Sequence, residues 1–142
     1  MSYSESLSKA ILVVIFISDK IRQRMFEFIS AQMISEMLKI PKPTLVKILR
    51  NLTHAGIIET KEGKNGGIRI AKPIAKITVL DVFNAMEQEK SLFQTVFNIA
   101  AEGKRPSNAQ KSVANLLENS EKQMKLTLAK KTIQDILEEM DG

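Results

Sequence analysis

Residues 43–71, PTLVKILRNLTHAGIIETKEGKNGGIRIA, predict a helix followed by a β-hairpin. The apolar residues of the helix recur at i, i+3, i+4 and i+7, which places them on one buried face. They are Leu45, Ile48, Leu49 and Leu52. Gly56 ends the helix as a C′ residue. The short apolar stretches 57–61 and 68–71 flank a tip whose Asn-Gly-Gly sequence permits the positive φ angles of a tight turn.

Two more helices are predicted before this segment. Residues 5–18 carry an apolar stripe with helical spacing, and residues 19–28 indicate a polar connection. Ser30 is a good N-cap for a second, short helix, which the IPKP sequence at 40–43 ends. A helix, a tight turn, a second helix and a glycine-tipped hairpin follow the order of a winged helix-turn-helix. The predicted fold is therefore mainly α with a small β-hairpin wing.

Positive charge is concentrated in the same part of the chain. The 142 residues carry a net charge of +5. Residues 39–72 hold eight Lys or Arg against two Asp or Glu, whereas residues 73–142 hold nine against ten. A local basic excess attracts polyanions, and counterion release makes nucleic acid the usual partner. We therefore expect double-stranded DNA as the partner of this segment.

The outer face of the second helix of this motif supplies the first set of predicted DNA contacts. The set comprises Lys42, Thr44, Val46, Lys47, Arg50, Asn51 and His54. Early residues of a recognition helix reach base edges in the major groove, so Thr44 and Lys47 are the predicted base contacts. Val46 either touches a thymine methyl or packs in the core. The other basic side chains are predicted to contact phosphates, which position the protein without specifying sequence.

The hairpin supplies the second set, because a wing beside the helix reaches phosphates or the adjacent minor groove. The set comprises Lys61, Lys64, Asn65, Gly66, Gly67 and Arg69. The glycines form the tip, and the basic and amide side chains contact the backbone or groove. For Arg69 two alternatives stay open, a DNA contact and a side chain that only faces solvent.

The later residues are predicted to be helical. ITVLDVFNAME at 77–87 indicates a helix with Thr78 and Asp81 as a capping box. Ser91 is a candidate cap for a short helix with Leu92, Phe93, Val96 and Phe97, and residues 102–108 are predicted to be a loop.

A long helix at about 109–129 carries an apolar stripe that predicts dimerisation. Its members are Val113, Leu116, Leu117, Met124 and Leu128. Thr132 caps a last short helix. We expect a DNA-binding domain at 1–88 and a dimerisation region at 89–142, packed on it.

Composition excludes several classes of function. The chain has no cysteine and one histidine, His54, which leaves no disulfide and no thiolate metal site. We expect no cofactor, no metal and no catalytic residues, because the sequence has one histidine, no cysteine and no cluster of metal ligands, and GKNGG lacks the spacing of a phosphate loop. The apolar run 10–17 is too short to span a bilayer and lacks the flanks of a signal peptide. A cytoplasmic protein without a membrane partner is expected.

Residues 44–87 resemble the Rrf-two family of bacterial transcription regulators, which includes iron–sulfur, nitric-oxide and cysteine-metabolism regulators. AGIIETKEGKNGGIRIA at 55–71 and ITVLDVFNAME at 77–87 carry the resemblance, which extends more weakly over most of the chain. It implies a homodimer that binds a near-palindromic operator, usually as a repressor, with the long helix pairing across the dimer.

The chain departs from the family pattern in three places. Many members bind an iron–sulfur cluster through three cysteines before the dimer helix, but residues 88–107 contain none. We therefore expect a member without a cluster. Glu62 stands where an arginine is common before the first wing glycine, and Val46 stands where a glutamate is common. The operator sequence of other members therefore does not carry over.

A protein-interaction adaptor is the alternative interpretation. In that case the stripe on 109–128 seats a partner helix and the basic segment holds an acidic protein. Steep salt sensitivity of binding to duplex DNA separates the two, because it reports counterion release. No inducing ligand or protein effector is identified by the sequence. Phe83, Phe93 and Phe97 are interpreted as core residues rather than a ligand site.

Overall fold

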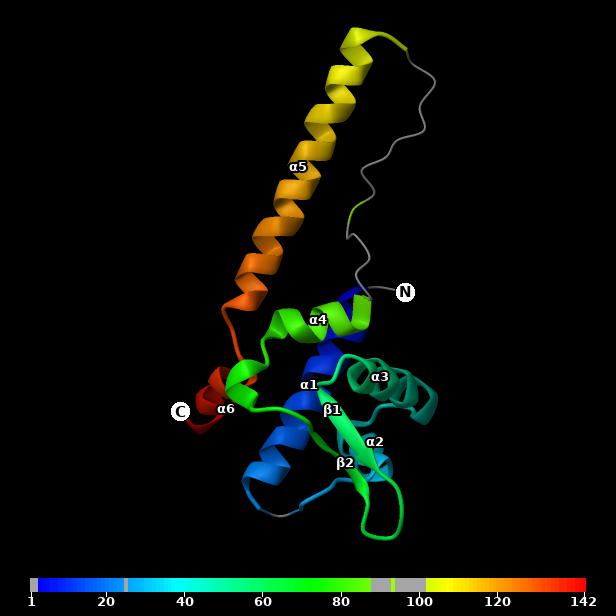
Figure 1. Cartoon of the computed structure of the whole chain (residues 1–142), viewed down its shortest axis with the longest axis vertical. Helices are drawn as coiled ribbons and strands as arrows, with labels where there is room; N and C mark the ends of the chain where they lie inside the picture. The colour runs from blue at the N-terminus through cyan, green and yellow to red at the C-terminus, as the bar shows by residue number, and fades with distance from the viewer. Residues whose placement is uncertain (1–2, 25, 88–92, 94–101) are drawn as a thin grey trace.

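The computed structural model describes residues 3–24, 26–87, 93 and 102–142. They form a helical body from which one long helix projects (Figure 1). The described elements are, in order, α1 (Tyr3–Arg22), α2 (Ala31–Leu38), α3 (Lys42–His54), β1 (Ile58–Lys61), β2 (Gly67–Ile70), the 3-10 helix η1 (Ile74–Lys76), α4 (Val79–Glu87), α5 (Lys104–Ala129) and α6 (Ile133–Asp141). The predicted fold class, mainly α with an antiparallel hairpin and a long C-terminal helix, is confirmed.

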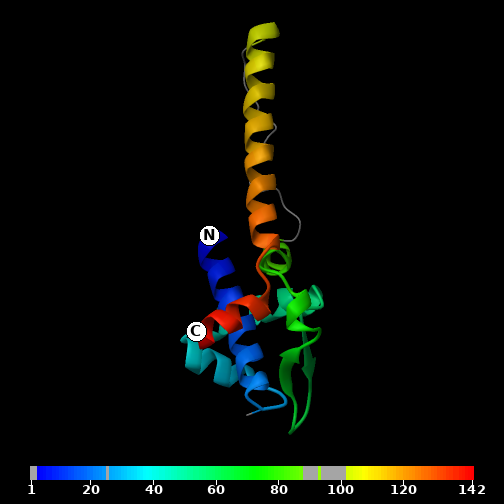
Figure 2. The same cartoon turned by 90° about the vertical axis from the view of Figure 1, so that its left-hand side faces the viewer.

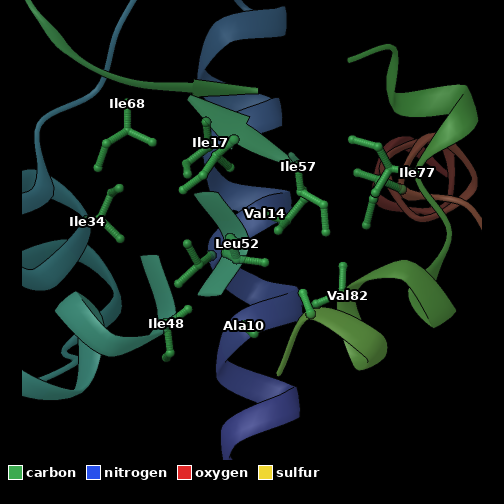
Figure 3. Packing of buried hydrophobic residues seen from close by; sticks show 14 of the residues in the cluster. Ala10, Val14, Ile17, Ile34, Ile48, Leu52, Ile57, Ile68, Ile77 and Val82 are labelled. Carbon is green, nitrogen blue, oxygen red and sulfur yellow. The ribbon is translucent and has the colours of Figure 1, made fainter. Parts of the chain in front are cut away.

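The core of the body is built around α1, which contacts α2, α3, α4, α6 and β2. Its buried residues Ala10, Val13, Val14 and Ile17 follow helical spacing. Figure 3 shows Val14 of α1 meeting Leu52 of α3 and Ile57 at the centre of the apolar cluster. In the described part of the chain, no helix combines the length and the apolarity that are needed to cross a membrane.

Helix α1 is longer than predicted, because it runs to Arg22 rather than ending at Ser18. The predicted polar connection is therefore wrong for residues 19–22. Arg22 donates hydrogen bonds to Asp19 one turn earlier and to Asp141 of α6, both at 3.0 Å. These two carboxylates are hydrogen-bond partners for the polar last turn of the helix, and one of them lies far away in the sequence.

The predicted helix-turn-helix is confirmed, although α3 begins at Lys42, one residue earlier than expected. Ser30 caps α2 by accepting a hydrogen bond from the backbone N–H of Met33 at 3.1 Å. Lys39 ends α2 in the left-handed conformation, and α3 begins directly after Pro41. The predicted apolar face of α3 is buried at Leu45, Ile48 and Leu52, whereas Leu49 is partly buried against the same core. Gly56 follows α3 with φ +76°.

The predicted hairpin is also confirmed, and it is fastened to the body at a third point. β1 and β2 pair in antiparallel register from Ile58 opposite Ile70 to Lys61 opposite Gly67. Ile29, in the connection between α1 and α2, forms an isolated antiparallel bridge with Ile68. Their two backbone hydrogen bonds measure 2.8 and 2.9 Å. The base of the wing is thus held between α3 and the α1–α2 connection.

Two neighbouring glycines make this arrangement sterically possible. A Cβ on Gly66 would lie 2.0 Å from the carbonyl oxygen of Lys61. A Cβ on Gly67 would lie 2.8 Å from the carbonyl oxygen of Ile29, and the φ of Gly67 is +144°. Any side chain at either position therefore pushes against the backbone that closes the hairpin or joins it to the body.

The C-terminal helices begin largely as predicted. Thr78 and Asp81 form the capping box of α4, with hydrogen bonds of 2.9 and 3.1 Å. Thr132 caps α6 through a second capping box with Asp135. Hydrogen bonds from the backbone and side chain of Thr132 to the Asp135 carboxyl hold the pKa of Asp135 below its ordinary value.

Helix α5 begins earlier than predicted, so the predicted loop at 102–108 is wrong from Lys104 onward. Pro106 lies in the first turn, where a missing N–H costs no intrahelical hydrogen bond. The predicted short helix after Ser91 and the predicted domain boundary near residue 88 fall outside the described residues, apart from Phe93. The boundary stays a prediction.

We predict that Gly66→Ala lowers the free energy of unfolding more than Gly63→Ala does. Gly63 has φ +106° but open space around it, so alanine there carries only the cost of a left-handed residue, about 1–2 kcal/mol. Gly66 is not in the left-handed region, but a Cβ there would lie 2.0 Å from the carbonyl oxygen of Lys61, and relieving this backbone overlap should cost about 3 kcal/mol or more, the upper end of what overpacking costs. Urea unfolding with an unchanged m value measures the difference. Equal losses at the two sites would contradict the steric argument.

Candidate nucleic-acid interface

Helix α3 and the wing are neighbours on one part of the body. β1 follows α3 after a short turn and contacts it. Figure 1 shows the two elements at the lower right, and the turned view in Figure 2 keeps them together. In both views the tip of the wing lies at the end of the molecule opposite the free end of α5. A helix and a protruding hairpin therefore form one continuous candidate surface.

The outer face of α3 is open to a ligand because the apolar stripe of the helix is buried in the core on the other side. Exposed on this helix are Lys42, Val46, Lys47, Arg50 and His54, while Thr44 and Asn51 are half-buried. Val46 is 50% exposed, which decides between its two sequence-based alternatives in favour of the outer surface. All seven predicted residues thus keep at least part of their side chains accessible.

The cations of α3 are electrostatically available. Within the described part of the chain, Lys42, Lys47 and Arg50 take part in no ion pair. A cation without an internal partner gains most from a phosphate, because it gives up only hydration and mobile counterions. The surface of α3 therefore has the charge that a polyanion requires.

The wing divides into an open tip and an occupied base. Lys61, Lys64 and Asn65 are exposed. Arg69, in contrast, lies opposite Glu59 in the ladder, and its Nε donates to the Glu59 carboxylate at 2.5 Å. This ion pair is partly exposed, with 43% of the Arg69 side chain accessible, so it does not decide between the two alternatives left open by the sequence. Its charge is paired within the protein.

Phe28 is a residue of this surface that sequence reasoning missed. Its half-buried ring lies beneath Arg69, with 4.8 Å between Cζ and the ring centroid, and beneath Lys61, with 5.5 Å from Nζ. The sequence placed Phe28 in a polar connection. The signal available in the sequence was that an aromatic residue, Phe28, stands next to Ile29 and close to the Ser30 cap, within a stretch predicted to be polar.

Comparisons with known proteins agree with this geometry. Residues 3–139 match the family model described as Rrf2, iron-dependent transcriptional regulator. YwgB of Bacillus subtilis, named as a candidate helix-turn-helix-type transcriptional regulator, is 32% identical over 103 residues. That match covers 68% of this chain and 64% of YwgB, less than two thirds of its length.

Solved structures share the fold. IscR of T. potens has a TM-score of 0.69 and 18% identity, with 99% of this chain and 88% of that chain covered. CymR, the global cysteine regulator of B. subtilis, has a TM-score of 0.62 and 16% identity, with 96% of this chain and 95% of that chain covered. At these identities the likeness establishes the fold alone.

The donor set of this chain does not fit the iron–sulfur cluster that many members of the resembled family bind. Iron–sulfur clusters are held by cysteine thiolates, with histidine replacing some of them in a few types. The sequence contains no cysteine. Among the described residues, no three His, Cys, Asp or Glu side chains are grouped so that they could hold a metal. The thiolates that such a cluster requires are missing from the whole chain.

Proposed function

The chain belongs to the Rrf2 family of transcriptional regulators, and we propose that it is a homodimeric repressor that binds duplex DNA through α3 and the wing. The observation that carries the proposal is the set of unpaired, exposed cations on α3 beside a protruding glycine-tipped hairpin. The family consists of transcriptional regulators, which confirms the expectation that the protein is not an enzyme.

In the proposed complex, α3 enters the major groove. The groove is about 12 Å wide and admits one helix, whose diameter with side chains is about 10–12 Å. Thr44 and Lys47 lie in the first turns of α3, from which side chains reach base edges. Lys47 donates to guanine O6 or N7, and Val46 contacts a thymine methyl. Arg50 and His54 lie further along the helix and contact phosphates.

The wing follows the adjacent backbone. Lys64 and Asn65 occupy the exposed tip between β1 and β2, and Lys61 lies at the end of β1. These contacts position the protein and carry no sequence information of their own. Arg69 is assigned to the base of the wing rather than to the DNA, because Glu59 neutralises it.

Dimerisation through α5 is the second part of the proposal. None of the described residues of α5 is buried, and Leu116 is 64% exposed. α4 lies against a different face, because Leu80 of α4 lines a groove together with Glu118, Lys122 and Leu126 of α5. Val113 and Leu116 of the apolar stripe are exposed, whereas Leu117, Met124 and Leu128 are half-buried, and the accessible part of the stripe is proposed to meet a second copy. A two-fold dimer would bind a near-palindromic operator, since half-sites mirror the symmetry of the protein.

Regulation proceeds, in this proposal, without an iron–sulfur cluster. The missing thiolates support this part. The repressor role is carried over from the family resemblance. The effector that would control DNA binding is then a small molecule or a protein.

We predict that Lys47→Ala reduces discrimination between operator and random DNA more than Lys64→Ala does. A base contact is worth about 1–3 kcal/mol of discrimination, so Lys47→Ala should reduce specific binding about 5- to 150-fold and leave random binding nearly unchanged. Lys64→Ala should weaken both alike and lower the salt slope by about one. Fluorescence anisotropy with genomic fragments selected by the protein, and with random duplexes, measures both.

The assigned roles would be refuted if Lys47→Ala weakened binding to random DNA as much as binding to the operator, as Lys64→Ala is expected to do. The adaptor interpretation would be favoured if the wild type shows no salt-dependent binding to duplex DNA and instead binds a protein partner in the absence of DNA.

We predict that Leu116→Lys shifts the protein from dimer to monomer. Leu116 is exposed within one copy, so lysine should leave the fold intact while each copy loses about 1.5–3 kcal/mol of apolar burial in the dimer. Asn115→Lys is the matched control, because it adds the same charge at an exposed position of α5 that lies outside the apolar stripe, about 100° around the helix from Leu116. Light scattering across micromolar concentrations reports the mass. A wild-type monomer, or equal effects of both lysines, would count against the proposed interface.

We predict that the purified protein is colourless after incubation with ferrous iron and sulfide under reducing conditions. The reason is the absence of thiolate ligands. DNA binding should also be indifferent to thiol oxidants, since no thiol exists to oxidise. Visible absorbance and anisotropy measure the two properties. A cluster absorbance band that accompanies the protein through gel filtration would contradict this part of the proposal.

A further inference from the structure

Phe28 joins three parts of the chain at the base of the wing. It precedes Ile29, whose backbone is hydrogen-bonded to Ile68 of β2 at 2.8 and 2.9 Å. Its ring lies 5.5 Å from the ammonium of Lys61 on β1 and 4.8 Å from the guanidinium of Arg69 on β2. One aromatic side chain from the α1–α2 connection therefore touches a cation from each strand.

The register of the hairpin explains why these groups meet. Alternate residues of a strand point to the same face, so Glu59 and Lys61 share a face of β1. The partner of Glu59 in the ladder is Arg69, and the partner of Lys61 is Gly67. Because Gly67 has no side chain, the backbone of Ile29 can approach it closely, with its carbonyl oxygen 2.8 Å from where a Cβ would lie. The other face carries Ile58 and Ile68, which are buried in the core.

The charges of this cluster are not equivalent. Arg69 has the Glu59 carboxylate as its ion-pair partner and the Phe28 ring against its guanidinium. Lys61 has the ring but, within the described part of the chain, no ion pair, and it remains exposed. The negative face of an aromatic ring attracts a cation without neutralising it. Arg69 therefore anchors the hairpin, while Lys61 keeps its charge for an outside anion.

We propose that Phe28 is a positioning residue for DNA binding, which acts by holding Lys61 in place to meet a phosphate. The inference rests on the proposed DNA-binding function and adds a residue outside α3 and the wing. A lysine whose rotamers are already restricted loses less conformational freedom when it binds, so the contact becomes tighter. Phe28 reaches the DNA through Lys61 and touches no nucleotide itself.

The test compares Phe28→Leu and Phe28→Tyr in the full chain, in three backgrounds: wild type, Lys61→Ala and Lys64→Ala. Leucine keeps the residue apolar and removes the aromatic face, whereas tyrosine retains that face. Phe28→Leu should weaken DNA binding about 3- to 10-fold in the wild-type and Lys64→Ala backgrounds. The loss should shrink below about twofold in Lys61→Ala. Phe28→Tyr should stay within about twofold of wild type.

Lys64 is the matched control, because it is an exposed wing lysine for which the structure shows no contact with Phe28. An equal loss in all three backgrounds would show that Phe28 only supports the fold and would overturn the proposal. A loss for tyrosine as large as for leucine would do the same. Phe28→Met provides a second non-aromatic variant if the leucine variant fails to fold.

A measurement without DNA separates this inference from the proposed function. Removing the ring should shift the NMR signals of the side chains of Lys61 and Arg69 and leave those of Lys64 in place. It should also speed amide hydrogen exchange at Ile68. Unchanged signals of Lys61 and Arg69 would overturn the positioning role whatever the DNA result. Wild-type protein that binds no duplex DNA would overturn the proposed function and the role of Phe28 in it, while these signals still report the contact.

Discussion

Burial of one apolar stripe on α3 is the constraint on which the interface depends. Leu45, Ile48 and Leu52 are packed into the core around α1, so helical periodicity turns Lys47 and Arg50 outward. The direction of the cations is therefore a consequence of core packing and needs no polar contact to maintain it. Loss of that packing would release the helix and its charged face together.

The wing depends on the same core through a different contact. Ile58 and Ile68 are buried, and the backbone bridge between Ile29 and Ile68 ties the hairpin to the α1–α2 connection. Gly67 permits that close approach, and Gly66 permits the hairpin to close against the backbone of Lys61. Helix and hairpin are consequently held on one frame, so a rigid duplex can meet both without first ordering either of them.

Local signals in the sequence predicted most of this frame, and long-range partners account for what they missed. The Ser30 and Thr132 caps, the capping box at Thr78 and the α3 stripe all depend on residues a few positions apart. The extension of α1 brings Arg22 to Asp141 in α6, a partner that no local pattern identifies. Arg69 was left undecided because its neighbours, Glu59 and Phe28, follow from strand register and from the packing of a distant connection.

The central claim is that one duplex engages the outer face of α3 and the tip of the wing at the same time. The most direct measurement is an NMR titration of the protein with a duplex selected from genomic DNA. The account predicts that the amide signals of Lys47 and Lys64 shift together, with the same dependence on DNA concentration. A duplex that moves one of these signals without the other, or that moves neither while binding elsewhere, would contradict it.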